Sequence, residues 1–212
     1  MDEYICSTWD VPNKLYRVHY PGSRTAFSCQ QGFTASDVTK IFHFGELSEF
    51  RKALEKQFTW SCRDPLPFIS LFSDERHAEN WARKEPWSEH KDSERNWALH
   101  VVNGVELRRT THIFRLSNLV KRLSLDVPER ARQHIQGAFI CLHRIPASAI
   151  LDSRTPAEIE HGKYTDTTDR EGERLDADTW DYLGDYGDND SDREMLQENY
   201  NTIFENNIEN NW

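Results

Sequence analysis

Two serines beside an apolar run are the first residues whose position suggests chemistry. The stretch PFISLFSDERHAENWA (residues 67–82) begins as an apolar run and then changes to a helical pattern. Ser73 precedes two acidic residues, so it is placed to cap the N-terminus of that helix. Ser70 lies inside the apolar run, which is typical of a buried strand. Ser70 is therefore either a strand serine bonded to backbone or part of the wall of a ligand site.

Most sequence signatures of catalysis are missing. The chain has no Walker phosphate loop, no GxGxxG, no GxSxG and no HExxH. Its four cysteines lack CxxC spacing and its histidines lack ligand spacing, so we expect no metal site. Cys141 lies in an apolar run and is expected in the core. A Cys–His nucleophile pair stays open, although nothing marks any one cysteine.

Hydrophobic periodicity predicts the elements that would position these residues. Residues 14–20 alternate in the manner of a strand, with Arg17 in the middle. Residues 45–58 carry an apolar stripe at helical spacing, which predicts an amphipathic helix. The stripe consists of Leu47, Phe50, Leu54 and Phe58.

The second half of the body is richer in predicted strands. WALHVV and HIFRLSNLV are expected to be strands around a turn at Asn103-Gly104, and AFICLHRI a further strand. PERARQHIQ is either a loop or a short helix. The order strand, helix, strand, helix and then several strands predicts one α+β domain of about 140 residues.

Charge is distributed unevenly along the chain. Residues 152–212 contain 18 acidic and 5 basic side chains, whereas residues 1–151 contain 18 acidic and 21 basic ones. The tail is acidic and rich in Gly and Asp, which is typical of partly disordered segments. Near its end, about residues 194–208 are expected to form an amphipathic helix that docks on the body, binds a partner or autoinhibits. The small positive balance of the body does not indicate nucleic-acid binding, although the tail itself could compete for a basic groove.

Four pieces of the body, in their order and spacing, resemble the ADP-ribosyltransferase fold. They are LYRVHYPGSRTAFSCQQGF, PFISLFSDERHAENWA, HIFRLSNLVKRL and IQGAFICLHRIPASAIL. The similarity is to the pierisin-type branch and related fungal domains of unknown function. It implies an α+β split β-sandwich with flanking helices over residues 14–151, after a lead-in at 1–13 and before the acidic tail at 152–212.

The resemblance also implies an NAD site. Arg17 would bind a phosphate through paired, charge-assisted hydrogen bonds. Ser70 matches the first serine of the family's Ser-Thr-Ser motif, while the next two positions depart from it, and Phe72 would flank the nicotinamide. Gln136 matches the first residue of a Gln-x-Glu motif. Ala138 replaces the glutamate that would stabilise the oxocarbenium-like state.

Two functions follow from these residues. The first is a divergent, toxin-like ADP-ribosyltransferase-like protein that binds NAD, with transferase or NAD-glycohydrolase activity left open by Ala138. The second is a pseudoenzyme, a catalytically inactive fold used as a protein-interaction module with the acidic tail as a regulatory or partner-binding segment. A protein substrate or partner is expected in either case. Without an 18-residue apolar run or a signal-peptide pattern, we expect a cytoplasmic or nuclear protein and no membrane contact.

Overall fold

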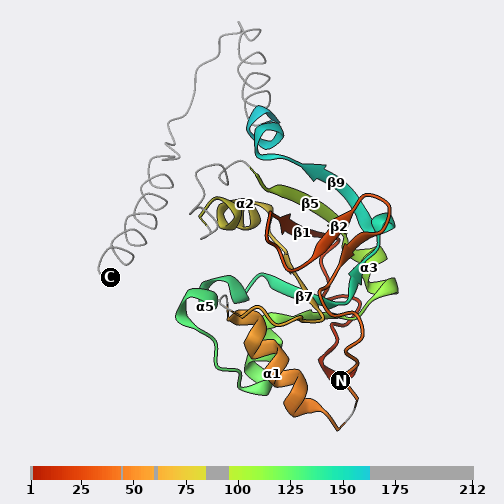
Figure 1. Ribbon diagram of the computed structural model, residues 1–212, viewed down its shortest axis with the longest axis vertical. Coiled ribbons are helices and arrows are strands. Elements are labelled where there is room, and N and C mark those ends of the chain that lie inside the picture. The colour runs from red at the N-terminus through yellow and green to blue at the C-terminus, as the bar shows by residue number, and fades with distance from the viewer. Residues whose placement is uncertain (1, 44, 60–61, 85–95, 163–212) are drawn as a thin grey trace, which may run out of the picture. The chain divides into compact units, whose positions relative to one another are not determined.

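The computed structural model describes residues 2–43, 45–59, 62–84 and 96–162 (Figure 1). All of these residues belong to the first of two units, Met1–Thr167. Their fold is α+β, as predicted, with two antiparallel sheets and flanking helices. None of the helices in these ranges is both long and apolar enough to cross a bilayer. The helix predicted at residues 194–208 lies outside the described residues.

The elements of this part of the chain alternate between short strands and short helices. The strands are β1 (Lys14–His19), β2 (Ala26–Ser28), β3 (Gly32–Thr34), β4 (Phe68–Phe72), β5 (Ala98–Asn103), β6 (Ile113–Arg115), β7 (Ala138–Leu142), β8 (Arg144–Ile145) and β9 (Ile150–Arg154). The labelled α-helices are α1 (Leu47–Phe58), α2 (Glu75–Lys84), α3 (Gly104–Thr110), α4 (Leu116–Leu123) and α5 (Glu129–Ile135), and residues 156–162 are helical as well. Two 3-10 turns are η1 (Asp2–Tyr4) and η4 (Ala147–Ala149).

The larger sheet consists of two halves that meet at one point. Its strand order is β6-β7-β4-β1-β5-β9, and a smaller sheet has the order β2-β3-β8. Strand β1 pairs with β5 along its whole length, and β4 pairs likewise with β7. Between β1 and β4, however, the paired residues are Tyr16 and Phe72 alone. The large sheet is therefore split between its two central strands.

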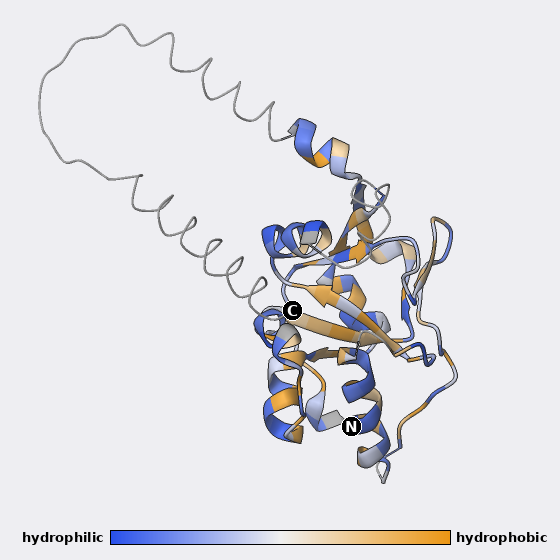
Figure 2. Ribbon diagram, turned by 60° about the vertical axis from the view of Figure 1, so that its left-hand side comes forward, coloured by the Kyte–Doolittle hydropathy of each residue, from blue (hydrophilic) through white to orange (hydrophobic). Residues whose placement is uncertain are grey.

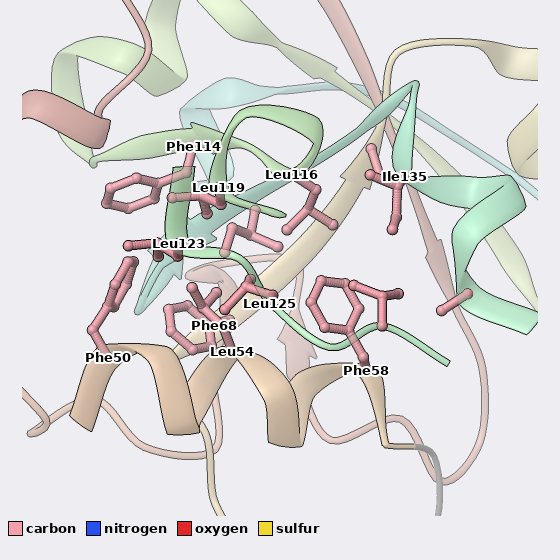
Figure 3. Packing of buried hydrophobic residues seen from close by; sticks show 14 of the residues in the cluster. Phe50, Leu54, Phe58, Phe68, Phe114, Leu116, Leu119, Leu123, Leu125 and Ile135 are labelled. Carbon is pink, nitrogen blue, oxygen red and sulfur yellow. The ribbon is translucent and has the colours of Figure 1, made fainter. Parts of the chain in front are cut away.

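One apolar cluster fills the space between α1 and the half-sheet of β4, β6 and β7. The predicted stripe of α1 is confirmed at Phe50, Leu54 and Phe58, which are buried, whereas Leu47 is 41% exposed. Figure 3 shows the three buried side chains pointing from α1 toward α4 and β6. The rings of Phe50 and Phe114 lie 5.6 Å apart. Burial of each such side chain contributes about 1.5–3 kcal/mol to folding.

Two further clusters cover the remaining faces of the strands. The second lies on the opposite face of β4 and β7 and joins the large sheet to the small one through Leu15, Phe33 and Phe139. The third packs α2 against β1 and β5 through residues such as Val18 and Leu99. In Figure 2 the central strands carry mostly hydrophobic colours, while the helices show both colours, as expected where one helical face meets a core.

The strand predicted at WALHVV is confirmed as β5, but the turn predicted after it at Asn103-Gly104 is wrong. The Asn103 side chain accepts hydrogen bonds from two backbone amides at 3.0 and 3.2 Å and caps helix α3 instead of forming a hairpin turn. HIFRLSNLV is likewise divided between strand β6 and helix α4. The reason is that Leu116, Leu119 and Leu123 fall on one helical face, which is buried in the first cluster.

The candidate NAD site and the family match

Arg17 lies at the centre of β1 and is 7% exposed. Its Nη1 donates to the backbone oxygen of Ser70 at 3.0 Å. Its Nη2 donates to the hydroxyls of Ser23 and Thr25 at 3.1 and 2.8 Å. Burial lowers the pKa of the guanidinium from its usual value. Arg17 therefore bridges β1, β4 and the turn that precedes β2.

Ser70 is placed in the middle of β4, and its hydroxyl has a partner that the sequence analysis missed. Gln57, on the last turn of α1, donates from Nε2 to the Ser70 hydroxyl at 3.0 Å. The available signal was the position of Gln57, three residues after Leu54 and so at the edge of the apolar stripe of α1. The site thus includes an amide from a helix that sequence reasoning assigned to packing alone.

The side chains of Arg17 and Ser70 project from opposite faces of the sheet. Because side chains alternate between the two faces along β1, Arg17 points to the same face as Leu15, which belongs to the second cluster. By the same alternation along β4, Ser70 points to the same face as Phe68, which belongs to the first cluster. The structure therefore brings the guanidinium to the Ser70 carbonyl, through the split in the sheet, and not to its hydroxyl.

Phe72 lies at the one point where the two halves of the sheet pair. It is 7% exposed, and its backbone is paired with Tyr16 of β1 and Ala138 of β7. Its ring packs beneath α2, with ring centroids 5.3 Å from His77 and 5.5 Å from Trp81. In this arrangement Phe72 forms part of the third cluster.

Gln136 and Ala138 flank the start of β7. Gln136 follows α5 and is exposed, whereas Ala138 is 5% exposed and is the first residue of β7. The nearest acidic residues in sequence are engaged elsewhere: Glu129 pairs with Arg132 at 3.0 Å. Ala138 therefore presents a methyl group where the family resemblance places a carboxylate.

The helix-cap role predicted for Ser73 is wrong. The amide and hydroxyl of Ser73 both donate to the carbonyl of Gly137, at 2.8 and 3.0 Å. The first turn of α2 is capped by Asp74, whose carboxylate accepts from the amide of His77 at 2.6 Å. Ser73 instead ties the end of β4 to the residue before β7.

Several buried nitrogens around Arg17 have no hydrogen-bond partner. They are Arg17 Nε, His19 Nδ1, Arg24 Nη1 and His100 Nε2. His100 lies opposite Arg17 in the sheet, and its Nδ1 is 2.7 Å from the Ser153 hydroxyl. Burial lowers the pKa of His100 to about 4, so the ring is neutral at neutral pH. Of these unpaired nitrogens, Arg17 Nε and Arg24 Nη1 are donors that could bond to an anion.

All of the residues described in this section lie in a segment that matches a known family. Residues 10–159 match the family described as "Domain of unknown function (DUF7587)". The chain belongs to the DUF7587 family. No curated protein matches it. Among solved structures, the DUF7587 chain is similar to EcPltA, with 13% identity and a TM-score of 0.42 over 68% of this chain and 75% of that chain.

Proposed function

We propose that this domain is a divergent ADP-ribosyltransferase-like protein that binds NAD at the split between β1 and β4 without efficient turnover. The observation that carries the proposal is the split itself. Strands β1 and β4 pair only at Tyr16 and Phe72, and Arg17 donates across the unpaired part to the backbone oxygen of Ser70. Arg17 and Ser70 are the residues that the resemblance assigns to NAD, and they come from segments 53 residues apart.

The unpaired nitrogens support an anionic ligand beside Arg17. A guanidinium and nearby donors suit a pyrophosphate, which accepts paired, charge-assisted hydrogen bonds. The hydroxyls of Ser23 and Thr25 accept hydrogen bonds from Arg17 Nη2, while Arg17 Nε and Arg24 Nη1 have no partner. Binding at this position would require the turn from Tyr20 to Thr25 to exchange its hydroxyls for phosphate oxygens.

Ala138 supports binding without turnover. Departure of nicotinamide develops positive charge on the ribose, and a carboxylate aimed at that charge stabilises the transition state. A methyl group at the matched position supplies no such stabilisation. We therefore expect NAD to be bound while nicotinamide release stays close to the uncatalysed background.

The test is an NAD titration of the folded protein by calorimetry and thermal unfolding. At 100 times Kd, a ligand that binds only the folded state should stabilise it by about 2.7 kcal/mol. Arg17→Lys keeps the positive charge but removes the planar guanidinium that makes paired hydrogen bonds, so this variant should lose NAD binding. The control variant Arg51→Lys, at an exposed position, should bind NAD like the wild type.

A second variant keeps the test decisive if Arg17→Lys does not fold. Thr25→Val removes an internal acceptor from Nη2 without changing the shape of the side chain, and it should preserve or strengthen NAD binding. The proposal fails if the folded wild type shows no saturable NAD binding. It also fails if a folded Arg17→Lys variant binds NAD as tightly as the wild type.

A second candidate function, a protein-interaction module, is favoured by the segment between β3 and α1. Ile41 is 64% exposed and Val38 is 38% exposed. Ile41 also lines a groove of about 320 Å³ with Phe42, Lys40, His112 and other residues. Exposed apolar side chains beside a groove are typical of docking surfaces. An Ile41→Asp variant that loses a protein partner retained by Arg17→Lys would favour this function over NAD binding.

A further inference from the structure

His77 and His134 form a pair that joins two helices. His77 lies in the first turn of α2 and His134 near the end of α5, 57 residues later. His77 Nε2 is 2.9 Å from His134 Nδ1, and the ring centroids are 5.0 Å apart at 69°. Both side chains are partly buried, with Phe72 on the other side of His77. The pair therefore lies beside Phe72 at the end of β4, and it includes neither Arg17 nor any hydrogen-bond partner of Arg17.

Burial favours the neutral form of both imidazoles. Burial lowers the pKa of His77. Burial, and then the neighbouring His77, lower the pKa of His134 to about 4. Asp74 acts on His77 in the opposite direction, raising its pKa. Because metal ions compete with protons for imidazole nitrogen, neutral rings leave their lone pairs available for coordination.

We propose that His77 and His134 together bind a late first-row divalent cation of the copper(II) or nickel(II) type. Metal–imidazole bonds are about 2.0–2.1 Å long, so two such bonds at a right angle separate their nitrogens by about 2.9 Å. The distance between His77 Nε2 and His134 Nδ1 is 2.9 Å. Right-angled neighbours occur in the tetragonal and octahedral sites of copper(II) and nickel(II). This site goes beyond the proposed NAD function and does not depend on it.

Coordination by both rings needs one change of tautomer. In the hydrogen-bonded pair one nitrogen carries a proton and donates the hydrogen bond, and the other nitrogen accepts that hydrogen bond. When both nitrogens bind metal, the donor ring holds that proton on its other nitrogen instead, so the charge of the ring does not change. Within the described residues no group of three or more His, Cys, Asp and Glu side chains could hold a metal, so water would fill the other positions.

The test compares variants that keep the hydrogen bond but remove the imidazole. In His77→Gln the amide nitrogen replaces Nε2, and in His134→Asn it replaces Nδ1. Neither amide is a good ligand for these metals. His43→Gln is the matched control, because His43 is exposed and apart from the pair. Full-length protein is titrated with CuCl2, NiCl2 and ZnCl2 alone, followed by calorimetry and thermal unfolding.

We expect saturable binding of one Cu²⁺ or Ni²⁺ to the wild type, binding tighter than Zn²⁺, and a raised melting midpoint. Each pair variant should weaken binding by more than the roughly 10- to 100-fold typical of outer-shell partners, while His43→Gln binds normally. Copper bound to two imidazoles should also show nitrogen hyperfine splitting in its EPR spectrum. The proposal is overturned if binding is unsaturable, or if the folded pair variants bind like the wild type. Loss of NAD binding would leave these results unchanged.

Discussion

The guanidinium of Arg17 ties together β1, β4 and the turn before β2. Its three hydrogen bonds connect it to Ser70, Ser23 and Thr25. Hydrogen bonds from a charged donor contribute about 1.5–3 kcal/mol each, and removal of the donor leaves its buried acceptors unpaired. Arg17 is therefore a structural residue in this arrangement, and any ligand role requires that some of these bonds be exchanged.

The stability of the protein should depend on pH through its buried histidines. For His134 and His100 the pKa is about 4 in the folded protein, against an ordinary value of 6.5. Between these values the unfolded chain binds more protons than the folded one, so the free energy of unfolding rises with pH in this window. We expect the melting midpoint to fall as pH is lowered from about 6.5 to about 4, measured with a chelator present.

The His134→Asn variant tests how much of the pH dependence of the melting midpoint comes from the His77–His134 pair. The variant should show a flatter profile of melting midpoint against pH than the wild type. His43→Asn, at an exposed position, should leave the profile unchanged. A His134→Asn profile as steep as that of the wild type would contradict the assignment to this pair.

At the scale of elements, strand β4 borders both the split in the large sheet and the continuous half that it forms with β7. One edge of it pairs fully with β7, and the other meets β1 only at Phe72. Its end is fixed by the two hydrogen bonds from Ser73 to Gly137. The split in the large sheet therefore lies between β4 and β1, while the β4–β7 half stays continuous.

The hairpin of β2 and β3 offers a test of close backbone packing. Gly22 and Gly32 have nearly the same positive φ, 83° and 81°, but different surroundings. A Cβ at Gly22 would meet nothing within 4 Å, whereas a Cβ at Gly32 would lie 2.1 Å from the carbonyl oxygen of Ile145. Gly22→Ala should cost about 1–2 kcal/mol from backbone strain, and Gly32→Ala about 2–5 kcal/mol because overpacking is added.

Chemical denaturation measures the free energies of unfolding of the Gly22→Ala and Gly32→Ala variants. The two substitutions share the strain of a positive φ, so their difference isolates the contact between β3 and β8. Equal losses of stability in the two variants would show that this contact contributes little.

At the scale of the molecule, three apolar clusters lie within the first unit, Met1–Thr167. A unit with its own core should fold independently. We expect the chain without residues 168–212 to unfold in one cooperative transition, with an enthalpy of roughly 120 kcal/mol for its 167 residues near 60 °C. Differential scanning calorimetry of the truncated chain and of the full-length chain measures this enthalpy. A broad transition with little enthalpy would show that the first unit does not fold alone.

The sequence by itself determined the features that depend on short-range periodicity. Three of the four stripe residues of α1 (Phe50, Leu54 and Phe58), the apolar strands β4 and β7, the burial of Cys141 and the α+β class are confirmed. Each of these follows from side chains that share one face of one element, and neighbours in sequence suffice to define that face.

Only the tertiary structure decided how those elements meet. Asn103-Gly104 suits a hairpin turn and a helix cap equally well locally, and burial of Leu107 of α3 in the second cluster favours the helical path. The register between β1 and β4 places Arg17 and the Ser70 hydroxyl on opposite faces of the sheet. The pairing of His77 with His134 joins residues 57 positions apart. Such contacts depend on packing between distant segments, which local sequence patterns do not encode.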